Sequence, residues 1–367
     1  MPTFHYSNPE VIHWGAGCLR EKLDSELRRV GGRRVFVVTT KSAVRDPALA
    51  PAVEALLGDR FAGRFADIGQ HAPARSVMDA VRAARESRAD VLLSIGGGSP
   101  IDATKAVAFS LATGLDLTLP DAPARSRSMK LERVLPHLSV PTTLSVAELA
   151  GSAGFSAEGT KEKVGVAAPE LRPAAVFYDA DVAVKTPLEL WLTTGIRAVD
   201  HAVETLLAPG EHPLPDVAAL DGLRRLRKGL LATKANPTDK AARTECQLGA
   251  WHSYLLPGPA AKGLSHTLGK RLGSRHDIPH GVSSCLVLPH VLRYLAPEAP
   301  ETMKRIAEAL EAPTAADGVA RLVSQLGLPC HLAAYKLSDD DLREAVRPVA
   351  SADHSQDDLV GILRAAL

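Results

Sequence analysis

Three consecutive glycines, Gly96–Gly98, are the first residues whose type and spacing suggest chemistry. They follow an apolar segment, residues 90–95, and precede Ser99, Pro100 and a stretch of helical spacing. Glycine has no Cβ, so a ligand can approach the backbone amides closely, and proline is well tolerated in the first helical turn. A helix N-terminus also presents free N–H groups, which favours a phosphate group. A tight turn without a ligand is the alternative that a glycine cluster alone leaves open.

A second candidate site consists of histidines in the second half of the chain: His201, His266 and His280. Imidazole exchanges protons near neutral pH and is a common metal ligand. One histidine on a helix is more often structural, so the set carries more weight than any member. Arg197 lies four residues before His201, and one helical turn places both on the same face.

Composition limits the classes of protein that are compatible with these sites. The chain has 367 residues, 46% of them hydrophobic, which favours two domains. Its 43 Lys plus Arg against 42 Asp plus Glu give no reason to expect nucleic acid as a partner. The cysteines show no CxxC spacing and are expected to be buried free thiols: Cys18, Cys246, Cys285 and Cys330. Neither a secretory signal nor an apolar run long enough to span a membrane is visible, so we expect a cytoplasmic protein without a membrane partner.

The elements that must position these residues follow from hydrophobic periodicity. Buried strands are predicted at residues 33–40, 90–98, 137–143 and 174–182. Helices are predicted between them at residues 76–89 and 100–113, an alternation typical of a parallel sheet covered by helices. After Thr186 only helical periods are visible. We therefore predict an α/β domain at residues 1–183, an all-helical domain at 184–367, and a surface loop at 119–132.

The motif GGGSPIDATK, residues 96–105, resembles the iron-containing (group III) alcohol dehydrogenases. VPTT at residues 140–143 and TKEKVG at residues 160–165 are similar to further cofactor segments of that family. The resemblance covers nearly the whole chain. It implies the group III alcohol dehydrogenase (dehydroquinate synthase-like) fold: an α/β dinucleotide-binding domain with a parallel sheet, an all-α catalytic domain, and an active site in the cleft between them.

The resemblance also implies that the glycine loop holds the pyrophosphate of NAD(H) or NADP(H). The residues that it assigns to the cofactor are Gly96, Gly97, Gly98, Ser99, Asp102, Thr142, Thr143, Lys163 and Thr40. NAD-selective relatives place an acidic residue after the second strand, where this chain reads TTKSA, residues 39–43. Because that segment has no carboxylate and Lys41 is nearby, we expect either cofactor to be accepted.

In the metal-dependent members of this family, an aspartate four residues before the first histidine completes a divalent site. This chain has Arg197 there, and a guanidinium cannot ligate a cation. Asp200 or Glu204 could supply a displaced ligand, whereas a salt bridge from Arg197 to Asp200 is the alternative. We expect no metal. If one binds, its ligands would be His201, His266 and His280, with Asp200 as a possible fourth.

The segment PTTLSVAE, residues 141–148, resembles the maleylacetate reductase branch of the family. This implies an NAD(P)H-dependent reductase of maleylacetate-type oxo or enoyl carboxylates that works without metal. Arg197 could then pair with a substrate carboxylate or stabilise negative charge on the acceptor oxygen, although it could also be a structural helix-pairing residue. The predicted catalytic residues are His201, His266, His280, Arg197 and His252.

Two other functions remain open at this point. One is a metal-dependent group III alcohol or aldehyde dehydrogenase, and the other is a non-redox lyase or cyclase on the same scaffold. The expected partner is a small, carboxylate-bearing substrate, and the resemblance suggests a homodimer. His276 is expected in a loop. The remaining histidines are expected to be structural: His5, His13, His137, His290, His331 and His354.

Overall fold

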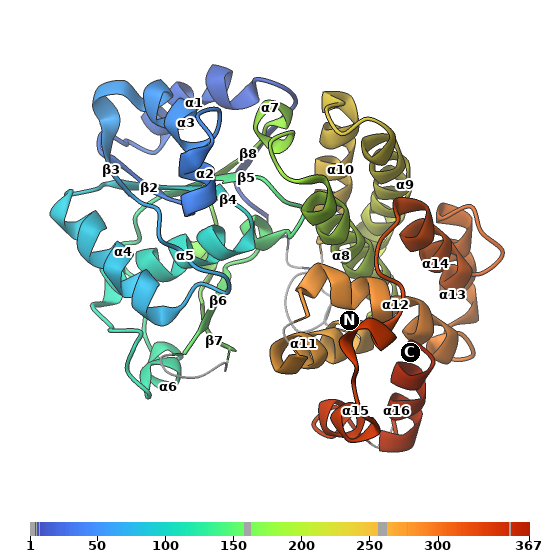
Figure 1. Ribbon diagram of the computed structural model, residues 1–367. Coiled ribbons are helices and arrows are strands. Elements are labelled where there is room, and N and C mark those ends of the chain that lie inside the picture. Colours follow the sequence, from blue (N-terminus) through green and yellow to red (C-terminus); the bar gives the residue numbers. More distant parts are fainter. Residues whose placement is uncertain are drawn as a thin grey trace. The chain divides into compact units, whose positions relative to one another are not determined.

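The chain forms two compact units, which are described separately (Figure 1). One unit spans Ser7–Thr186, and the other spans Pro187–Leu367 with the described residues that precede Ser7. The computed structural model describes residues 4, 6, 8–157, 163–255, 263–276, 278–351 and 354–367. The side chains of Lys163, Ser274 and His280 are not part of this description.

The first unit is built on a six-stranded sheet in the order β1-β8-β5-β4-β2-β3, in which every neighbouring pair is parallel. The strands are β1 (Val11–Trp14), β2 (Val35–Val38), β3 (Phe61–Phe65), β4 (Val91–Gly96), β5 (His137–Pro141) and β8 (Ala175–Tyr178). The four strands predicted from the sequence are β2, β4, β5 and β8, and the parallel α/β fold is confirmed. A parallel sheet has its carboxyl ends at one edge, so the segments after β4 and β5 lie together.

Helices cover both faces of this sheet, as Figure 1 shows. Strand β2 explains why: Val35 and Val37 pack into one buried cluster, whereas Phe36 and Val38 pack into the other. The helices of this unit are α1 (Cys18–Arg29), α2 (Lys41–Arg45), α3 (Ala50–Leu57), α4 (Ala74–Glu86), α5 (Gly98–Thr113), α6 (Ala122–Ser126) and α7 (Ala180–Ala183). Helices α1 and α3 contribute to the first cluster, and α4 and α5 contribute to the second.

Two features of this unit differ from the sequence-based prediction. An antiparallel hairpin, β6 (Ser152–Ser156) with β7 (Lys163–Ala167), follows the short 3-10 turn η2 (Ala147–Leu149). It was not predicted because small and polar residues dominate both strands. The predicted loop at residues 119–132 was wrong in part, because it contains α6, whose second residue is proline, a favourable residue at a helix start.

The described part of the second unit is helical and contains no strand, as predicted. Its α-helices are α8 (Leu188–Leu207), α9 (Pro213–Ala235), α10 (Lys240–His252), α11 (Leu264–His276), α12 (His280–Leu295), α13 (Pro300–Ala309), α14 (Ala315–Leu326), α15 (Asp339–Val346) and α16 (Gln356–Arg364). A search of the described residues finds no helix with the length and apolarity needed to cross a bilayer. All four cysteines are free, but Cys330 is exposed, which corrects the expectation that every thiol is buried.

Close contact between α9 and α10 depends on glycine. A Cβ built on Gly229 would lie 2.7 Å from the Sγ of Cys246 and 3.1 Å from its backbone nitrogen. Such distances are shorter than ordinary van der Waals contacts, so a larger residue must separate the helices. The two helices therefore approach each other along a surface that tolerates no extra methyl group at this position.

We predict that Gly229→Ala destabilises the protein by about 2 kcal/mol, because overpacking at a close helix crossing costs that order of free energy. Gly361→Ala on α16 is the matched control, since a Cβ there meets nothing within 4 Å. The control is expected to be neutral or slightly stabilising because alanine favours helices. Urea denaturation of both variants measures the difference, and equal free energies of unfolding would contradict the packing argument.

Candidate active site

The glycine loop lies where β4 ends and α5 begins. Gly96 has φ +139°, and a Cβ on it would lie 2.6 Å from the Cγ of Pro100, so this position requires glycine. The backbone N–H of Thr142 donates to the carbonyl of Gly96 over 2.9 Å, which ties the loop to the end of β5. The 16-residue helix α5 starts at Gly98, and the free amides of its first turn are therefore at the carboxyl edge of the sheet.

Two hydroxyl groups face this loop from the segment after β5. A Cβ on Gly97 would lie 3.1 Å from the Oγ1 of Thr143, and one on Gly98 would lie 3.3 Å from the Oγ of Ser145. Both hydroxyls are buried and have no hydrogen-bond partner among the described residues. A buried hydroxyl normally has a partner, so the pair is compatible with a polar ligand beside the glycines. Thr143 is one of the residues predicted to bind the cofactor, and that stays a prediction, whereas Ser145 was not among them.

Three other residues predicted to bind the cofactor make hydrogen bonds or ion pairs within the protein. Ser99 accepts a hydrogen bond from the backbone N–H of His71 over 3.2 Å. Asp102 is 2.7 Å from the Nζ of Lys105 and also accepts from the backbone of β6. Thr40 caps α2 by accepting from the N–H of Ala43 over 3.4 Å. Lys163 is the first residue of β7, but its side chain lies outside the description. Residues 158–162, which precede it, also lie outside the described residues.

An ion pair that was not predicted from the sequence joins the segment after β2 to the segment after β3. The Nζ of Lys41 is 2.7 Å from the Oδ1 of Asp67, and both side chains are well exposed. Asp67 follows β3, the neighbour of β2, so it reaches Lys41 through the parallel pairing of these strands. A carboxylate is thus present beside this turn, although the turn itself carries none.

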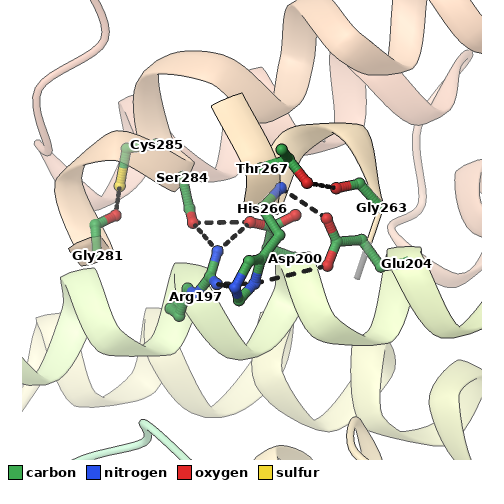
Figure 2. A network of polar contacts seen from close by, with 9 residues as sticks. All are labelled: Arg197, Asp200, Glu204, Gly263, His266, Thr267, Gly281, Ser284 and Cys285. Atoms are coloured by element: carbon green, nitrogen blue, oxygen red, sulfur yellow. Dashed lines mark hydrogen bonds and ion pairs between the residues drawn. The ribbon is translucent and has the colours of Figure 1, made fainter. Parts of the chain in front are cut away.

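In the helical unit, α8 presents one stripe of polar side chains. Arg197, Asp200 and Glu204 lie on one face because they are separated by three and four residues. The Nη1 of Arg197 is 2.8 Å from the Oδ2 of Asp200, so the predicted salt bridge forms. Ser284 of α12 donates to the same Oδ2 over 2.7 Å and accepts from Arg197 over 3.0 Å (Figure 2).

His266 is the second partner of Arg197. Figure 2 shows its ring beside the guanidinium, whose Nη2 contacts Nδ1 and is 3.2 Å from Nε2. A guanidinium donates but cannot accept, so the ring nitrogen that meets it carries a lone pair. Arg197 connects a carboxylate on its own helix to an imidazole on α11.

Glu204 links α8 to the start of α11. Its Oε1 accepts the backbone N–H of His266 over 2.7 Å, and its Oε2 is 3.9 Å from the ring Nδ1. Burial raises the pKa of Glu204 well above its usual range, and the negative charge of Asp200 adds to the rise. Burial likewise raises the pKa of Asp200, although Arg197 and the hydroxyl of Ser284 oppose the increase. The site therefore combines one permanent cation with two carboxyl groups that resist ionisation.

The three remaining predicted catalytic residues, all histidines, differ in their positions. His201 lies near this cluster, with its ring centroid 5.9 Å from that of His266 and 5.0 Å from that of Tyr254. His252 points elsewhere, because its Nδ1 is 2.7 Å from the Oδ2 of Asp221 on α9. His280 begins α12, but its side chain lies outside the described residues. Tyr254 was missed by sequence reasoning, since no motif surrounds it.

The cluster places possible metal ligands beside a permanent cation. Among the described residues, His201, Glu204 and His266 can each offer one ligand atom within 4.8 Å of the others. However, the guanidinium of Arg197 contacts the Nδ1 of His266, and its positive charge would repel a cation. Asp200, the possible replacement ligand, already binds Arg197 and Ser284 through Oδ2.

Comparisons with known proteins identify the family of the chain. The model of the iron-containing alcohol dehydrogenase family matches residues 9–180, and its C-terminal domain model matches residues 191–362. The chain thus belongs to the iron-containing alcohol dehydrogenase family and is an oxidoreductase.

Within this family, the chain is similar to maleylacetate reductases. It is 32% identical to the maleylacetate reductase of Sphingobium indicum over 92% of this chain and 88% of that protein. It is also 32% identical to maleylacetate reductase 2 of Cupriavidus pinatubonensis over 98% and 94%, respectively. The crystal structure of the Agrobacterium tumefaciens maleylacetate reductase has a TM-score of 0.84 at 28% identity and covers 100% of this chain and 99% of that one.

We predict that Arg197→Met destabilises the protein by about 3 kcal/mol, because it leaves the fully buried Asp200 without its cation. The pKa of Asp200 is already raised, and this loss raises it further. When the pKa of a carboxyl group is higher in the folded than in the unfolded protein, the free energy of unfolding falls as pH rises. The variant should therefore lose more stability near about pH 8 than near about pH 5.

The double variant Arg197→Met/Asp200→Asn is the control for this prediction. It should recover most of the lost stability and reduce the added pH dependence, because Asp200, the carboxyl group that pairs with Arg197, is no longer present, whereas Glu204 remains. Thermal and urea unfolding at both pH values measure these changes. If the double variant were no more stable than Arg197→Met, the buried ion pair would not be the cause.

Proposed function

We propose that the protein is an NAD(P)H-dependent reductase of maleylacetate-type oxo or enoyl carboxylates and that it works without a bound metal ion. The observation that carries this proposal is the contact of Arg197 with His266, in the cluster where a metal-dependent relative would hold its ion. The similarity to maleylacetate reductases over nearly the whole chain supports the substrate class.

The glycine loop supports the cofactor. Its free amides, the start of α5 and the two buried hydroxyls of Thr143 and Ser145 form a cradle that a Cβ on Gly97 or Gly98 would fill. Such a cradle suits the pyrophosphate of a dinucleotide. The bound nicotinamide would supply the hydride. The proposal requires that this cofactor and the histidine cluster of the helical unit act on the same substrate.

The residues of the helical unit would supply charge and a proton. Hydride addition to a carbon conjugated with a carbonyl places negative charge on oxygen, and Arg197 would stabilise that charge or hold a substrate carboxylate. The described contacts engage only part of the donor capacity of its guanidinium, which has five N–H groups. His201 or His266 would then deliver the proton to the neighbouring carbon. A homodimer remains a prediction from the family resemblance.

We predict that chelator-treated protein consumes NADH or NADPH when maleylacetate is added, and that Fe²⁺ or Zn²⁺ does not increase the rate. The reason is that Arg197 performs the electrostatic role of a metal. Nicotinamide absorbance measures turnover, with simple aldehydes and ketones as comparison substrates. Activity on simple carbonyls that appears only after metal addition would favour a metal-dependent alcohol dehydrogenase. Nucleotide binding without net consumption would favour a lyase or cyclase.

We also predict that both nicotinamide cofactors support turnover, because Lys41 can meet a 2′-phosphate while Asp67 pairs with it in the structure. Lys41→Glu should lower kcat/KM for NADPH at least about tenfold relative to NADH, since a carboxylate repels the extra phosphate. Lys130→Glu, elsewhere on the same unit, controls for the change in net charge. An unaltered NADPH to NADH ratio would exclude Lys41 from cofactor selection.

A further inference from the structure

The turn between β5 and η2 contains a strained residue. Val146 has φ +56° and ψ +17°, and its side chain is buried, with 3% exposed. A β-branched residue rarely adopts this left-handed conformation, because its Cβ substituents crowd the backbone. Such a residue persists only when its surroundings impose the conformation. The segments on both sides of Val146 must therefore be held in place.

Lys105 holds the segment that follows. Its side chain is fully buried, and its Nζ is 2.9 Å from the carbonyl of Ala147, 3.3 Å from that of Ala150 and in contact with that of Ser152. An ammonium has three donors, so these carbonyls can use all of its hydrogen-bonding capacity. Asp102 balances the charge at 2.7 Å.

Two further hydrogen bonds hold the segment from η2 to β6. One is made by Asp102 of α5, and the other by Tyr178 of β8. The Oδ2 of Asp102 accepts the backbone N–H of Gly154 in β6 over 3.2 Å. The hydroxyl of Tyr178 donates to Glu148, in the middle of η2, over 2.8 Å, and both side chains are buried. The turn η2 is therefore fixed from α5 and from β8 by buried polar side chains.

On the other side of Val146 lie the two hydroxyls that face the glycine loop. Ser145 is its direct neighbour, and Thr143 is three residues before it. A rotation of the backbone at Val146 would move Ser145 away from Gly98, where a Cβ would lie 3.3 Å from its Oγ. The conformation of one strained residue thus determines how these hydroxyls meet the loop.

We propose that Lys105, together with the Glu148–Tyr178 pair, forms a positioning device that keeps Val146 left-handed and so presents Thr143 and Ser145 to the cofactor pyrophosphate. This inference rests on the proposed binding of a nicotinamide nucleotide at the glycine loop. The inference also gives the last part of the glycine motif a role other than direct contact with the cofactor. Asp102 and Lys105 act on the protein backbone, and their effect on the cofactor is indirect.

The first test is Lys105→Met, which keeps the length of the side chain but removes the ammonium. NADH affinity, measured by fluorescence titration of the folded protein, should fall roughly tenfold, the factor that matches the strain of one unsupported left-handed residue. The kcat at saturating NADH should change less than twofold, because the reacting groups are untouched. Tyr178→Phe provides a milder variant and should weaken NADH binding about threefold.

The second test separates positioning from general stability. Val146→Gly added to Lys105→Met should recover most of the NADH affinity, because glycine adopts the left-handed conformation without support. The same change should lower the thermal midpoint further, since a buried side chain is lost. Val166→Gly in the same background is the matched control. It removes an equally buried valine from β7 and should lower the midpoint without recovering affinity.

Opposite changes in affinity and thermal midpoint would support the inference. Unchanged NADH affinity in both Lys105→Met and Tyr178→Phe would overturn it, as would equal behaviour of the Val146→Gly and Val166→Gly double variants. A wild-type protein that binds neither NADH nor NADPH would overturn the proposed function itself and this inference with it. Failure of the proposed function is thus distinguishable from failure of the positioning device.

Discussion

The candidate site of the helical unit depends on one constraint: a permanent cation, 13% exposed, lies beside two buried carboxyl groups and an imidazole. A guanidinium keeps its charge in proteins and only donates hydrogen bonds, so the side chains around Arg197 must accept them. Asp200 pairs with it, His266 presents a lone pair to it, and Ser284 completes the set from a third helix. These contacts fix the relative positions of α8, α11 and α12. They also decide what chemistry the cluster can perform.

The metal-free chemistry that we propose follows from the same constraint. Where an aspartate would attract a divalent ion, a guanidinium repels it, and the positive charge is already part of the protein. The cost of burying this cation is offset by Asp200, whose raised pKa shows that burial still disfavours the carboxylate. Glu204 adds a second carboxyl group that burial tends to keep protonated.

Much of the fold could be predicted from the sequence because it follows from short-range patterns. Apolar runs gave β2, β4, β5 and β8, and helical spacing gave the all-helical second unit. The edge strands and the β6–β7 hairpin were missed, since their residues are small, polar or half-buried and carry weak periodicity.

The candidate site was predicted less completely. Residue spacing placed Arg197 beside Asp200, but the contact with His266 joins positions 69 residues apart, and no local pattern encodes it. Ser145 lies within the PTTLSVAE segment but was not singled out, and no recognisable motif surrounds Ser284 or Tyr254. Lys105 belonged to the glycine motif, yet only the structure shows that its ammonium meets backbone carbonyls. A buried lysine one helical turn after an aspartate was the available signal, and it does not distinguish a structural role from a ligand-binding one.

The measurement that tests the central claim most directly is calorimetric titration of Fe²⁺ and Zn²⁺ into metal-free protein, in parallel with the Arg197→Asp variant. If Arg197 replaces the metal, the wild-type protein will show no tight stoichiometric site, whereas the variant will gain one that is lost when His266 is also changed to alanine. Tight binding of one equivalent by the wild-type protein, abolished by His266→Ala alone, would contradict the account. It would mean that Arg197 moves aside and that the cluster still assembles around an ion.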